Sequence, residues 1–239
     1  MTWSIVAYDP ATGAFGAAAA TQAFAAGSFV PFVRSSVGAV GTQSITNRYL
    51  AAATLDGLAR GLSAQLAIDA AIAGDEGRDI RQLHCVDREG RIAAWTGRHC
   101  VEWAGSVGEP CVSVAGNMLA NDDVAAATLA GFNADQTAPL PERLMAAMEA
   151  GEAAGGDRRG RRSAAMVMTT TEDFPDLTLR VDDHADPMAE LRRLLTIWRT
   201  ERAPYLGNSP SKANPAGQHD IDVIEAGWIS RGWDIRFRR

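Results

Sequence analysis

The sequence lacks the features that would place the chain in a membrane or on a nucleic acid. No run of about 18 apolar residues occurs in its 239 residues, so we expect no transmembrane helix and no membrane partner. The start, Met-Thr-Trp-Ser, has no basic region and no cleavage site, which predicts no signal peptide. A net charge of −6 and a pI near 5.2 argue against nucleic acid as the main partner.

Cysteine and histidine are also scarce, which limits metal and redox chemistry. The three cysteines are an odd number without metal-ligand spacing, so a reducing cytoplasm is the simplest location. The four histidines are scattered, and His84 in a predicted strand is interpreted as a hydrogen-bonded core residue. Asp182, Asp183 and His184 have metal-binding chemistry, but a turn that caps the following helix is the favoured interpretation. We therefore predict no metal site and no cofactor.

The common catalytic motifs are missing, and their absence directs attention to the N-terminus. The chain has no Gly-x-Ser-x-Gly elbow, no Walker loop and no dinucleotide fingerprint. If Met1 is removed, the Thr2 hydroxyl lies beside its own α-amine, whose ordinary pKa of about 8 suits a general base. One residue then supplies both nucleophile and base. The alternative is an ordinary Met-Thr start, and if Met1 stays, Ser4 cannot substitute because it has no adjacent free amine.

What is present is a set of short apolar strands, rich in small residues, and paired amphipathic helices. Hydrophobic residues make up 46% of the chain, enough for a sizeable core. Turn residues and apolar periodicity define the elements. The predicted strands are 3–8, 14–21, 36–42, 80–86, 92–96, 111–115, 163–169 and 177–181, and the predicted helices are 47–60, 63–73, 121–132, 141–154 and 186–202.

The order of these elements predicts the fold class. Parallel βαβ alternation is absent, and hairpins plus paired helices favour two antiparallel sheets with helices on their outer faces, an α+β layered sandwich. We expect one domain over residues 1–202 and a C-terminal extension over 203–239, in which 203–219 is an irregular arm with three prolines and two glycines. Trp228 and Trp233 suggest that the extension packs on the body or on another subunit, so a homodimer or higher homo-oligomer stays open.

A glycine-rich basic loop precedes the strand at 163–169. It crowds Asp157 with Arg158, Arg159, Arg161 and Arg162. We expect Asp157 to pair with one arginine and the remaining positive charge to meet an anion, most simply a carboxylate. The alternative is a solvated turn with an internal ion pair, because charge-rich surface loops are common.

Several motifs, taken in order, resemble the bacterial and archaeal family called domain of unknown function 1028. The resemblance spans about residues 2–198 and implies the four-layer αββα sandwich of N-terminal nucleophile (Ntn) hydrolases. Arg162 departs from the glutamine expected in the family's loop and adds charge beside the proposed pocket. The motifs are Thr2 to Ala7 with Asp9-Pro10 and Thr12-Gly13; Ala39 to Ser44 with Thr46-Asn47; Arg81-Gln82-Leu83; Thr96-Gly97 with Cys100 and Trp103-Ala104-Gly105; Gly116-Asn117 with Leu119; Gly155 to Arg161 with Ser163-Ala164-Ala165; and Leu179 to His184 with Asp186-Pro187.

The resemblance implies a catalytic arrangement around Thr2. The Thr2 hydroxyl would attack an amide carbonyl, its amine would take and return the proton, and water would hydrolyse the acyl-enzyme. Arg34 would lower the pKa of the amine. The Asn117 amide, or backbone N–H groups near Gly41–Thr42, would hold the oxyanion. For Asn117 the alternative is a turn cap.

Substrate contacts are expected from two segments. Gln43 and Asn47 are candidates for hydrogen bonds to the substrate, although both are equally suited to anchoring their loop. Asp157 with Arg158 or Arg159 would orient the amine or bind a substrate carboxylate.

The predicted function is therefore cleavage of a C–N (amide) bond in a small, carboxylate-bearing substrate, with Thr2 as nucleophile. Whether the protein is an enzyme stays open. The alternative is a non-catalytic module on the same fold that binds a small carboxylate ligand. A weaker alternative is peptidoglycan-related amide hydrolysis, because similar proteins carry an added peptidoglycan-binding domain. We expect neither that domain nor a secretion signal here, so this alternative ranks last.

Overall fold

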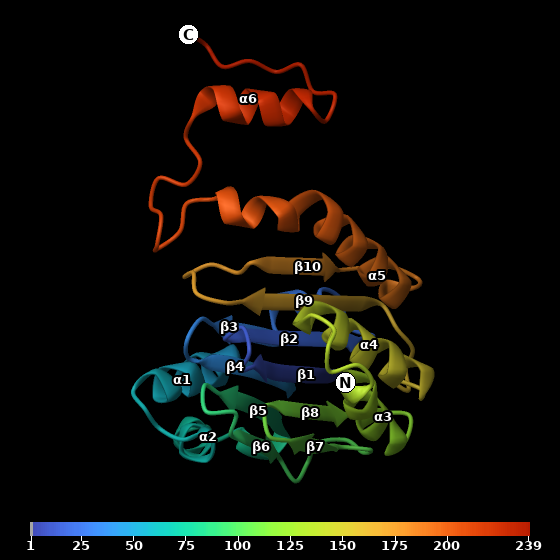
Figure 1. Cartoon of the computed structure of the whole chain (residues 1–239). Coiled ribbons are helices and arrows are strands. Elements are labelled where there is room, and N and C mark those ends of the chain that lie inside the picture. Colours follow the sequence, from blue (N-terminus) through green and yellow to red (C-terminus); the bar gives the residue numbers. More distant parts are fainter. Residues whose placement is uncertain (1) are drawn as a thin grey trace. The chain divides into compact units, whose positions relative to one another are not determined.

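The computed structural model describes residues 2–239, and the chain forms two compact units. The first unit runs to Ile197, and the second covers Trp198–Arg239 (Figure 1). The predicted boundary lay a few residues later, between 202 and 203. Met1, whose removal the Thr2 hypothesis requires, lies outside the described residues.

Two antiparallel sheets form the centre of the first unit. Within the described residues, one sheet has six strands in the order β10-β9-β2-β1-β8-β7, and the other has four in the order β3-β4-β5-β6. The first strand of the chain is therefore central in the larger sheet. The strands are β1 (Thr2–Asp9), β2 (Ala14–Thr21), β3 (Pro31–Arg34), β4 (Gly38–Ser44), β5 (Arg81–Asp87), β6 (Ile92–Thr96), β7 (Gly105–Glu109), β8 (Val112–Asn117), β9 (Ser163–Thr169) and β10 (Leu177–Val181).

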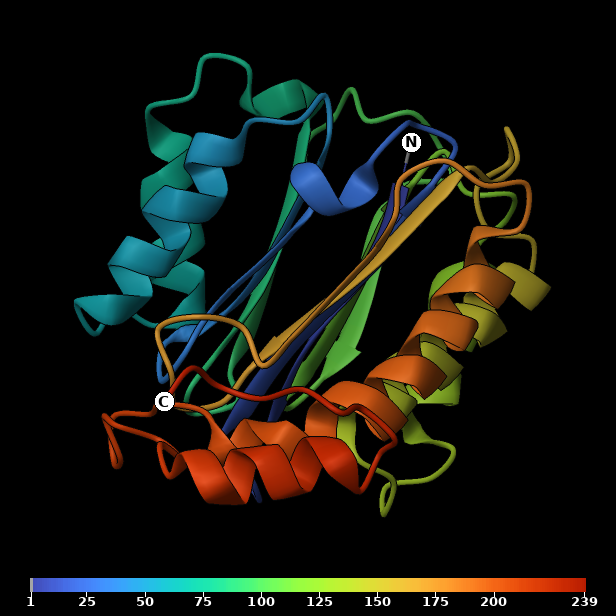
Figure 2. The same ribbon diagram turned by 90° about the horizontal axis from the view of Figure 1, so that it is seen from above.

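Helices cover the outer faces of both sheets, as the layers in Figure 2 show. The pair α1 and α2 packs on the four-stranded sheet, and α3, α4 and α5 pack on the six-stranded sheet. The predicted α+β class with two antiparallel sheets and helices outside them is confirmed. The helices are α1 (Arg48–Ala59), α2 (Ala64–Ala73), α3 (Asp123–Asn133), α4 (Leu140–Ala153) and α5 (Pro187–Ile197).

Local side-chain chemistry sets several element boundaries. Asp9 accepts hydrogen bonds from the Ala11 backbone N–H and the Thr12 hydroxyl, which shapes the β1–β2 turn. The side chain of Asn47 accepts from the Tyr49 N–H at the start of α1. Ser63, the first residue of the predicted helix 63–73, caps α2 in the same way.

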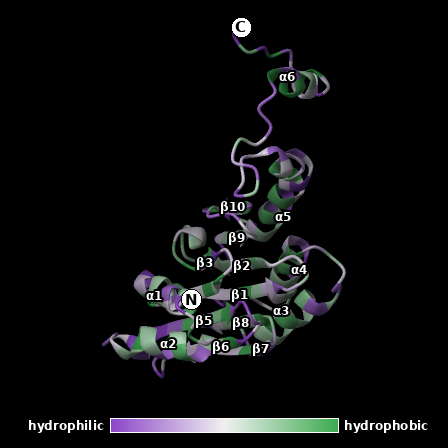
Figure 3. Ribbon diagram, turned by 60° about the vertical axis from the view of Figure 1, so that its left-hand side comes forward, coloured by the Kyte–Doolittle hydropathy of each residue, from purple (hydrophilic) through white to green (hydrophobic). Residues whose placement is uncertain are grey.

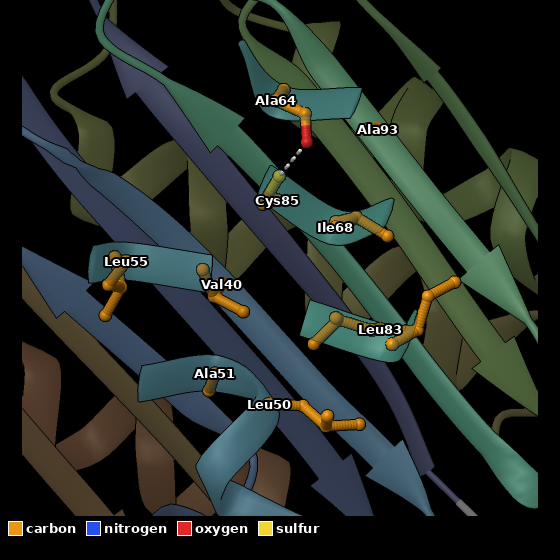
Figure 4. Close-up of a cluster of buried hydrophobic side chains, with 10 residues drawn as sticks. Val40, Leu50, Ala51, Leu55, Ala64, Ile68, Leu83, Cys85 and Ala93 are labelled. Atoms are coloured by element: carbon orange, nitrogen blue, oxygen red, sulfur yellow. Dashed lines mark hydrogen bonds between the residues drawn. The ribbon is translucent and has the colours of Figure 1, made fainter. Parts of the chain in front are cut away.

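The main apolar core on the four-stranded sheet lies between its strands and the α1–α2 pair. Figure 4 shows these side chains converging from both layers. The Cys85 thiol points into this core 3.7 Å from the Ala64 carbonyl oxygen, and burial raises its pKa to about 12. Cys85 is therefore an inert core residue. The labelled members are Val40, Leu50, Ala51, Leu55, Ala64, Ile68, Leu83, Cys85 and Ala93.

Three elements escape sequence-based prediction. The strands β3 and β7 are short, and each lies at an edge of its sheet. Neither combines an alternating apolar pattern with full burial, so the periodic signal is weak. In the second unit, a helix α6 (Ile221–Ile229) follows the arm in a segment to which we assigned no element from the sequence, with Asp220 as its N-cap.

The polarity of the chain follows this layering. In Figure 3 the sheet strands of the first unit are mainly green or pale, and purple is concentrated on loops and helix surfaces. Among the described residues, no helix combines the length and the apolar character needed to cross a membrane.

Candidate active site at the start of the first strand

Thr2 is the first residue of β1 and lies between the ends of two flanking strands. Its register partner on β8 is Asn117, and β2 pairs on the other side from Trp3 onward. Ser4 on β1 points toward the four-stranded sheet, where it contacts Gln43. Because side chains alternate along a strand, the Thr2 side chain faces the same space between the sheets. Thr2 is 3% exposed.

A buried amide network holds the end of β1. The Asn117 Nδ2 group donates to the Thr2 carbonyl oxygen at 3.5 Å and to Gln82 Oε1 at 3.0 Å. Gln82 Oε1 also accepts from Gln43 Nε2 at 2.8 Å, and Gln82 Nε2 donates to the Gly116 carbonyl at 2.7 Å. Gln82 therefore joins the four-stranded sheet to β8, whose Asn117 side chain bonds the Thr2 carbonyl.

The network continues inward to a buried histidine. The Ser4 hydroxyl lies 2.8 Å from His84 Nε2 and donates to Gln43 Oε1 at the same distance. The other ring nitrogen, Nδ1, lies 3.1 Å from the Ser113 hydroxyl. A Cβ on Gly41 would overlap the His84 ring, so glycine gives the ring its space. Burial lowers the pKa of His84 to about 3, which keeps the ring neutral at pH 7.

The prediction that His84 is a hydrogen-bonded core residue is confirmed. The partners Gln82 and Ser113 were missed by sequence reasoning, and so was the role of Ser4. The only available signal was polar residues alternating inside apolar strands, and that pattern does not say which strands face one another.

The basic loop crosses the end of β1 from β8 to β2. The backbone of Asp157 forms a bridge with Leu119, just after β8, and its carboxylate accepts from the Gln22 N–H at 2.8 Å, just after β2. Arg159 donates to the same carboxylate from its backbone N–H and its guanidinium. The Asp157 side chain is fully buried. The loop therefore brings a buried carboxylate to the strand ends that flank Thr2.

The other arginines of the loop separate into paired and unpaired groups. Arg161 pairs with Glu152 and Asp186, and Arg162 pairs with Asp183 at 2.9 Å. For Arg161 and Arg162, these ion pairs agree with the alternative interpretation, a solvated turn with internal ion pairs. Arg158 is exposed.

Arg158 has no hydrogen-bond or ion-pair partner of its side chain among residues 2–239. The loop therefore retains one exposed guanidinium that is available to an anion.

Arg34 is not brought to Thr2. It ends β3 opposite Gly38, the first residue of β4, whereas the Thr2 end of the sandwich is near Gln43 at the other end of that strand. Five residues of strand separate these positions by roughly 16 Å. The Arg34 guanidinium instead binds Asp56 on α1 at 2.9 Å. We therefore leave Arg34 out of the candidate site.

The predicted substrate contacts are also engaged by the protein itself. Gln43 is fully buried, and its amide bonds Ser4 and Gln82 as described above. The Thr42 N–H donates to the Val30 carbonyl, and the Thr42 hydroxyl donates to the Asn47 carbonyl. These residues position the site, and neither presents a free donor for an oxyanion.

A surface pocket of about 530 Å³ lies at the same end of β4 and β5 as Gln43 and Gln82. It includes Asn47, whose side chain caps α1, and Arg48, which has no carboxylate partner among residues 2–239. The lining residues are Ser28, Phe29, Thr46, Asn47, Arg48, Tyr49 and Arg81.

No group of three or more metal-ligating side chains is found in the part of the chain that the structure describes. At the former metal candidate, His184 Nδ1 accepts from the Asp186 N–H at 3.0 Å, just before α5. This agrees with the turn interpretation of that segment.

Comparison with known proteins identifies the family. The family model described as "Family of unknown function (DUF1028)" matches residues 2–191. A crystal structure of a Silicibacter pomeroyi protein, assigned to the same family model, aligns with a TM-score of 0.85 and 32% identity, covering 92% of this chain and 96% of that chain.

A second structure, Anbu (ancestral beta-subunit) from Yersinia bercovieri, aligns with a TM-score of 0.37 and 9% identity over 84% of this chain and 97% of that one, too low to support a conclusion. No curated protein matches the chain. The family model covers most of the sequence, and the similar crystal structure covers nearly all of it. The chain therefore belongs to the DUF1028 family.

Proposed function

We propose that this protein is an N-terminal nucleophile amidohydrolase that uses Thr2, freed by removal of Met1, to cleave an amide bond. The observation that carries the proposal is the placement of Thr2. It starts a central strand, faces the space between two helix-covered sheets, and is held through its carbonyl by Asn117. The buried Asp157 carboxylate lies across the adjoining strand ends. An α-amine and a hydroxyl on one fixed residue form a nucleophile with its own base.

The proposed reaction has two steps. The Thr2 hydroxyl oxygen attacks the substrate carbonyl carbon while the α-amine takes the hydroxyl proton. The amine returns that proton to the departing nitrogen as the C–N bond breaks, leaving an ester on Thr2. Water then hydrolyses the ester with the same amine as base. The negative charge of Asp157 favours the ammonium form between these transfers.

A small, carboxylate-bearing substrate suits the charges around this end of the sandwich. Arg158 on the loop has no side-chain partner among residues 2–239, and Arg48 in the 530 Å³ pocket has no carboxylate partner there. A guanidinium binds a carboxylate through two parallel N–H donors. We propose that Arg158 contacts the substrate carboxylate and that Asp157 with Arg159 orients the Thr2 amine.

The test is to compare two chains that differ only in Met1. Cleavage of a fusion protein can deliver the chain with Thr2 as its first residue or with Met1 retained, and intact mass confirms each. Both are assayed for amine release from a panel of N-acyl amino acids. We expect turnover from the free-Thr2 chain alone, and a loss of about 10³-fold or more in Thr2→Ala. Equal turnover by both chains, or by Thr2→Ala, contradicts the proposal.

The second candidate is the binding module, which the unpartnered Arg158 and the 3% exposure of Thr2 both favour. A binding module keeps its affinity for an N-acyl amino acid in Thr2→Ala and loses it in Arg158→Ala, by about 2 kcal/mol for one charge-assisted contact. Arg162→Ala is the matched control, because Arg162 pairs with Asp183. Affinity that depends on Arg158 without any turnover would select this candidate.

A further inference from the structure

The second unit contains a cavity of its own, of about 270 Å³. It lies between the segment 202–209 and α6. The Gln218 backbone N–H donates to the Asn208 carbonyl at 2.9 Å, which holds the chain before α6 against the segment 202–209. Its size suits a small molecule rather than a protein segment. Its lining includes two arginines, Arg202 and Arg231, and two aromatic residues, Tyr205 and Trp228.

The charge of this unit is opposite to that of the rest of the chain. Residues 198–239 contain seven Lys or Arg against five Asp or Glu, although the whole protein has a net charge of −6. Most carboxylates of the unit already have partners: Asp234 binds Arg236, and Asp222 and Glu225 bind Arg239. These ion pairs involve Arg236 and Arg239 and neither of the arginines that line the cavity.

Two arginines of the unit line the cavity. Arg202 and Arg231 have no ion pair with a carboxylate among residues 2–239. The Arg231 guanidinium is held over the Tyr205 ring at 4.1 Å from the centroid, and the Trp233 ring lies 5.6 Å away. Stacking fixes the plane of the guanidinium and leaves its edge donors free for a planar anion.

The rest of the wall is apolar and aromatic. Trp228 faces the cavity and is supported by a ring contact with Phe237, at 5.0 Å between centroids. Val223 and Ile224 on α6 add aliphatic surface. A ligand with a carboxylate at one end and a flat apolar body at the other would match both halves of this wall.

We propose that this cavity is a second ligand site, which binds a small carboxylate with an aromatic or apolar body through Arg202 and Arg231. It is separate from the Thr2 site in sequence, although both sites would bind a carboxylate through arginine, and the Trp228 signal reports on this cavity alone. It needs neither removal of Met1 nor turnover.

The test uses hippurate and its neutral analogue hippuramide on the full chain, followed by the indole N–H signals of the six tryptophans in a ¹⁵N spectrum. The Trp228 signal is assigned with Trp228→Phe. We expect hippurate to shift the Trp228 signal with a dissociation constant in the millimolar range, as suits a fragment-sized ligand. Hippuramide should bind about tenfold or more weakly, because it lacks the charge.

Variants separate a built site from general attraction to a basic surface. Arg231→Gln and Arg202→Gln should each weaken hippurate binding about tenfold. Arg236→Gln is the matched control, since Arg236 pairs with Asp234 and does not line the cavity. Arg231→Gln also removes the stack on Tyr205, so its effect could come from a changed cavity shape. Arg202→Gln tests the charge without disturbing that stack. The proposal is overturned if 20 mM hippurate leaves the Trp228 signal unchanged, if hippuramide binds equally well, or if Arg236→Gln weakens binding as much as the cavity variants.

Discussion

The two ends of the space between the sheets differ in side-chain chemistry, because one is apolar and the other is polar. At the far end from Thr2, apolar side chains meet across the gap, among them Val6, Phe15 and Val86. At the Thr2 end the same strands carry polar side chains that bond one another, with Gln82 as the hub and His84 as the innermost member. Both ends are buried, so exposure does not explain the difference.

The difference shows what each end contributes. Apolar contacts stabilise the sandwich in proportion to buried area and tolerate small shifts of one sheet over the other. Hydrogen bonds are short and directional, and a buried polar group left without a partner costs about 1–3 kcal/mol. The polar end therefore restricts the position of β1 relative to β4 and β5 more tightly, and Thr2 is the residue that this restriction places.

The largest expected effect comes from breaking the polar end at its hub. Gln82→Leu removes the acceptor for Gln43 and Asn117 and the donor to the Gly116 carbonyl. We expect the free energy of unfolding in urea to fall by about 4 kcal/mol, because several buried groups lose partners together. Amide exchange at Trp3 and Ser4 should accelerate more than at Tyr8. A loss under about 1 kcal/mol would mean that apolar packing can replace the network.

A smaller effect should follow from pH through His84. Its pKa is about 3 in the folded chain against an ordinary 6.5, so the unfolded chain binds the proton more readily. The stability gained from keeping the ring neutral is fully present above pH 6.5 and is lost as pH falls from 6.5 toward 3. We expect a loss of about 2 kcal/mol between pH 7 and pH 5 from this group.

The measurement compares unfolding at the two pH values in the wild type and in two variants. His84→Gln should flatten the pH dependence by that amount, whereas His99→Gln, at an exposed position, should leave it unchanged. An unchanged slope in His84→Gln would show that the ring is not the buried group that responds.

The smallest effect is expected at the apolar end. Phe15 stacks on Tyr8 with 4.6 Å between ring centroids. Phe15→Leu keeps the site apolar, so we expect a loss of only about 1 kcal/mol from the ring contact and a small volume change. Turnover by the free-Thr2 chain and amide exchange at Trp3 should match the wild type. A change in either would show that the two ends are coupled and that the apolar end also positions Thr2.

Much of the secondary structure was predictable because its signals are local. Asp9 with Gly13 marks the first hairpin, and Asn47 and Ser63 mark helix starts, since each acts on backbone within a few residues. The short edge strands lacked such signals, whereas α6 has a local cap in Asp220 that sequence reasoning did not use. For the site, Thr2 could be nominated from its chemistry, and pairing of Asp157 with a neighbouring arginine from their spacing.

The chemical character of each segment was determined by the sequence alone: the hairpins, the helix caps, the apolar faces and the residues able to act as nucleophile or base. Only the tertiary structure decided which polar groups meet, because Ser4, Gln43, Gln82 and Asn117 come from four strands far apart in the chain. Arg34 illustrates the same limit. The sequence suggested a basic residue near Thr2, but Arg34 lies at the end of β3 that is far from Thr2 and binds Asp56 there. The register between strands, and the residues of the two sheets that lie opposite one another, depend on the packing of the whole domain. No local sequence pattern contains that information.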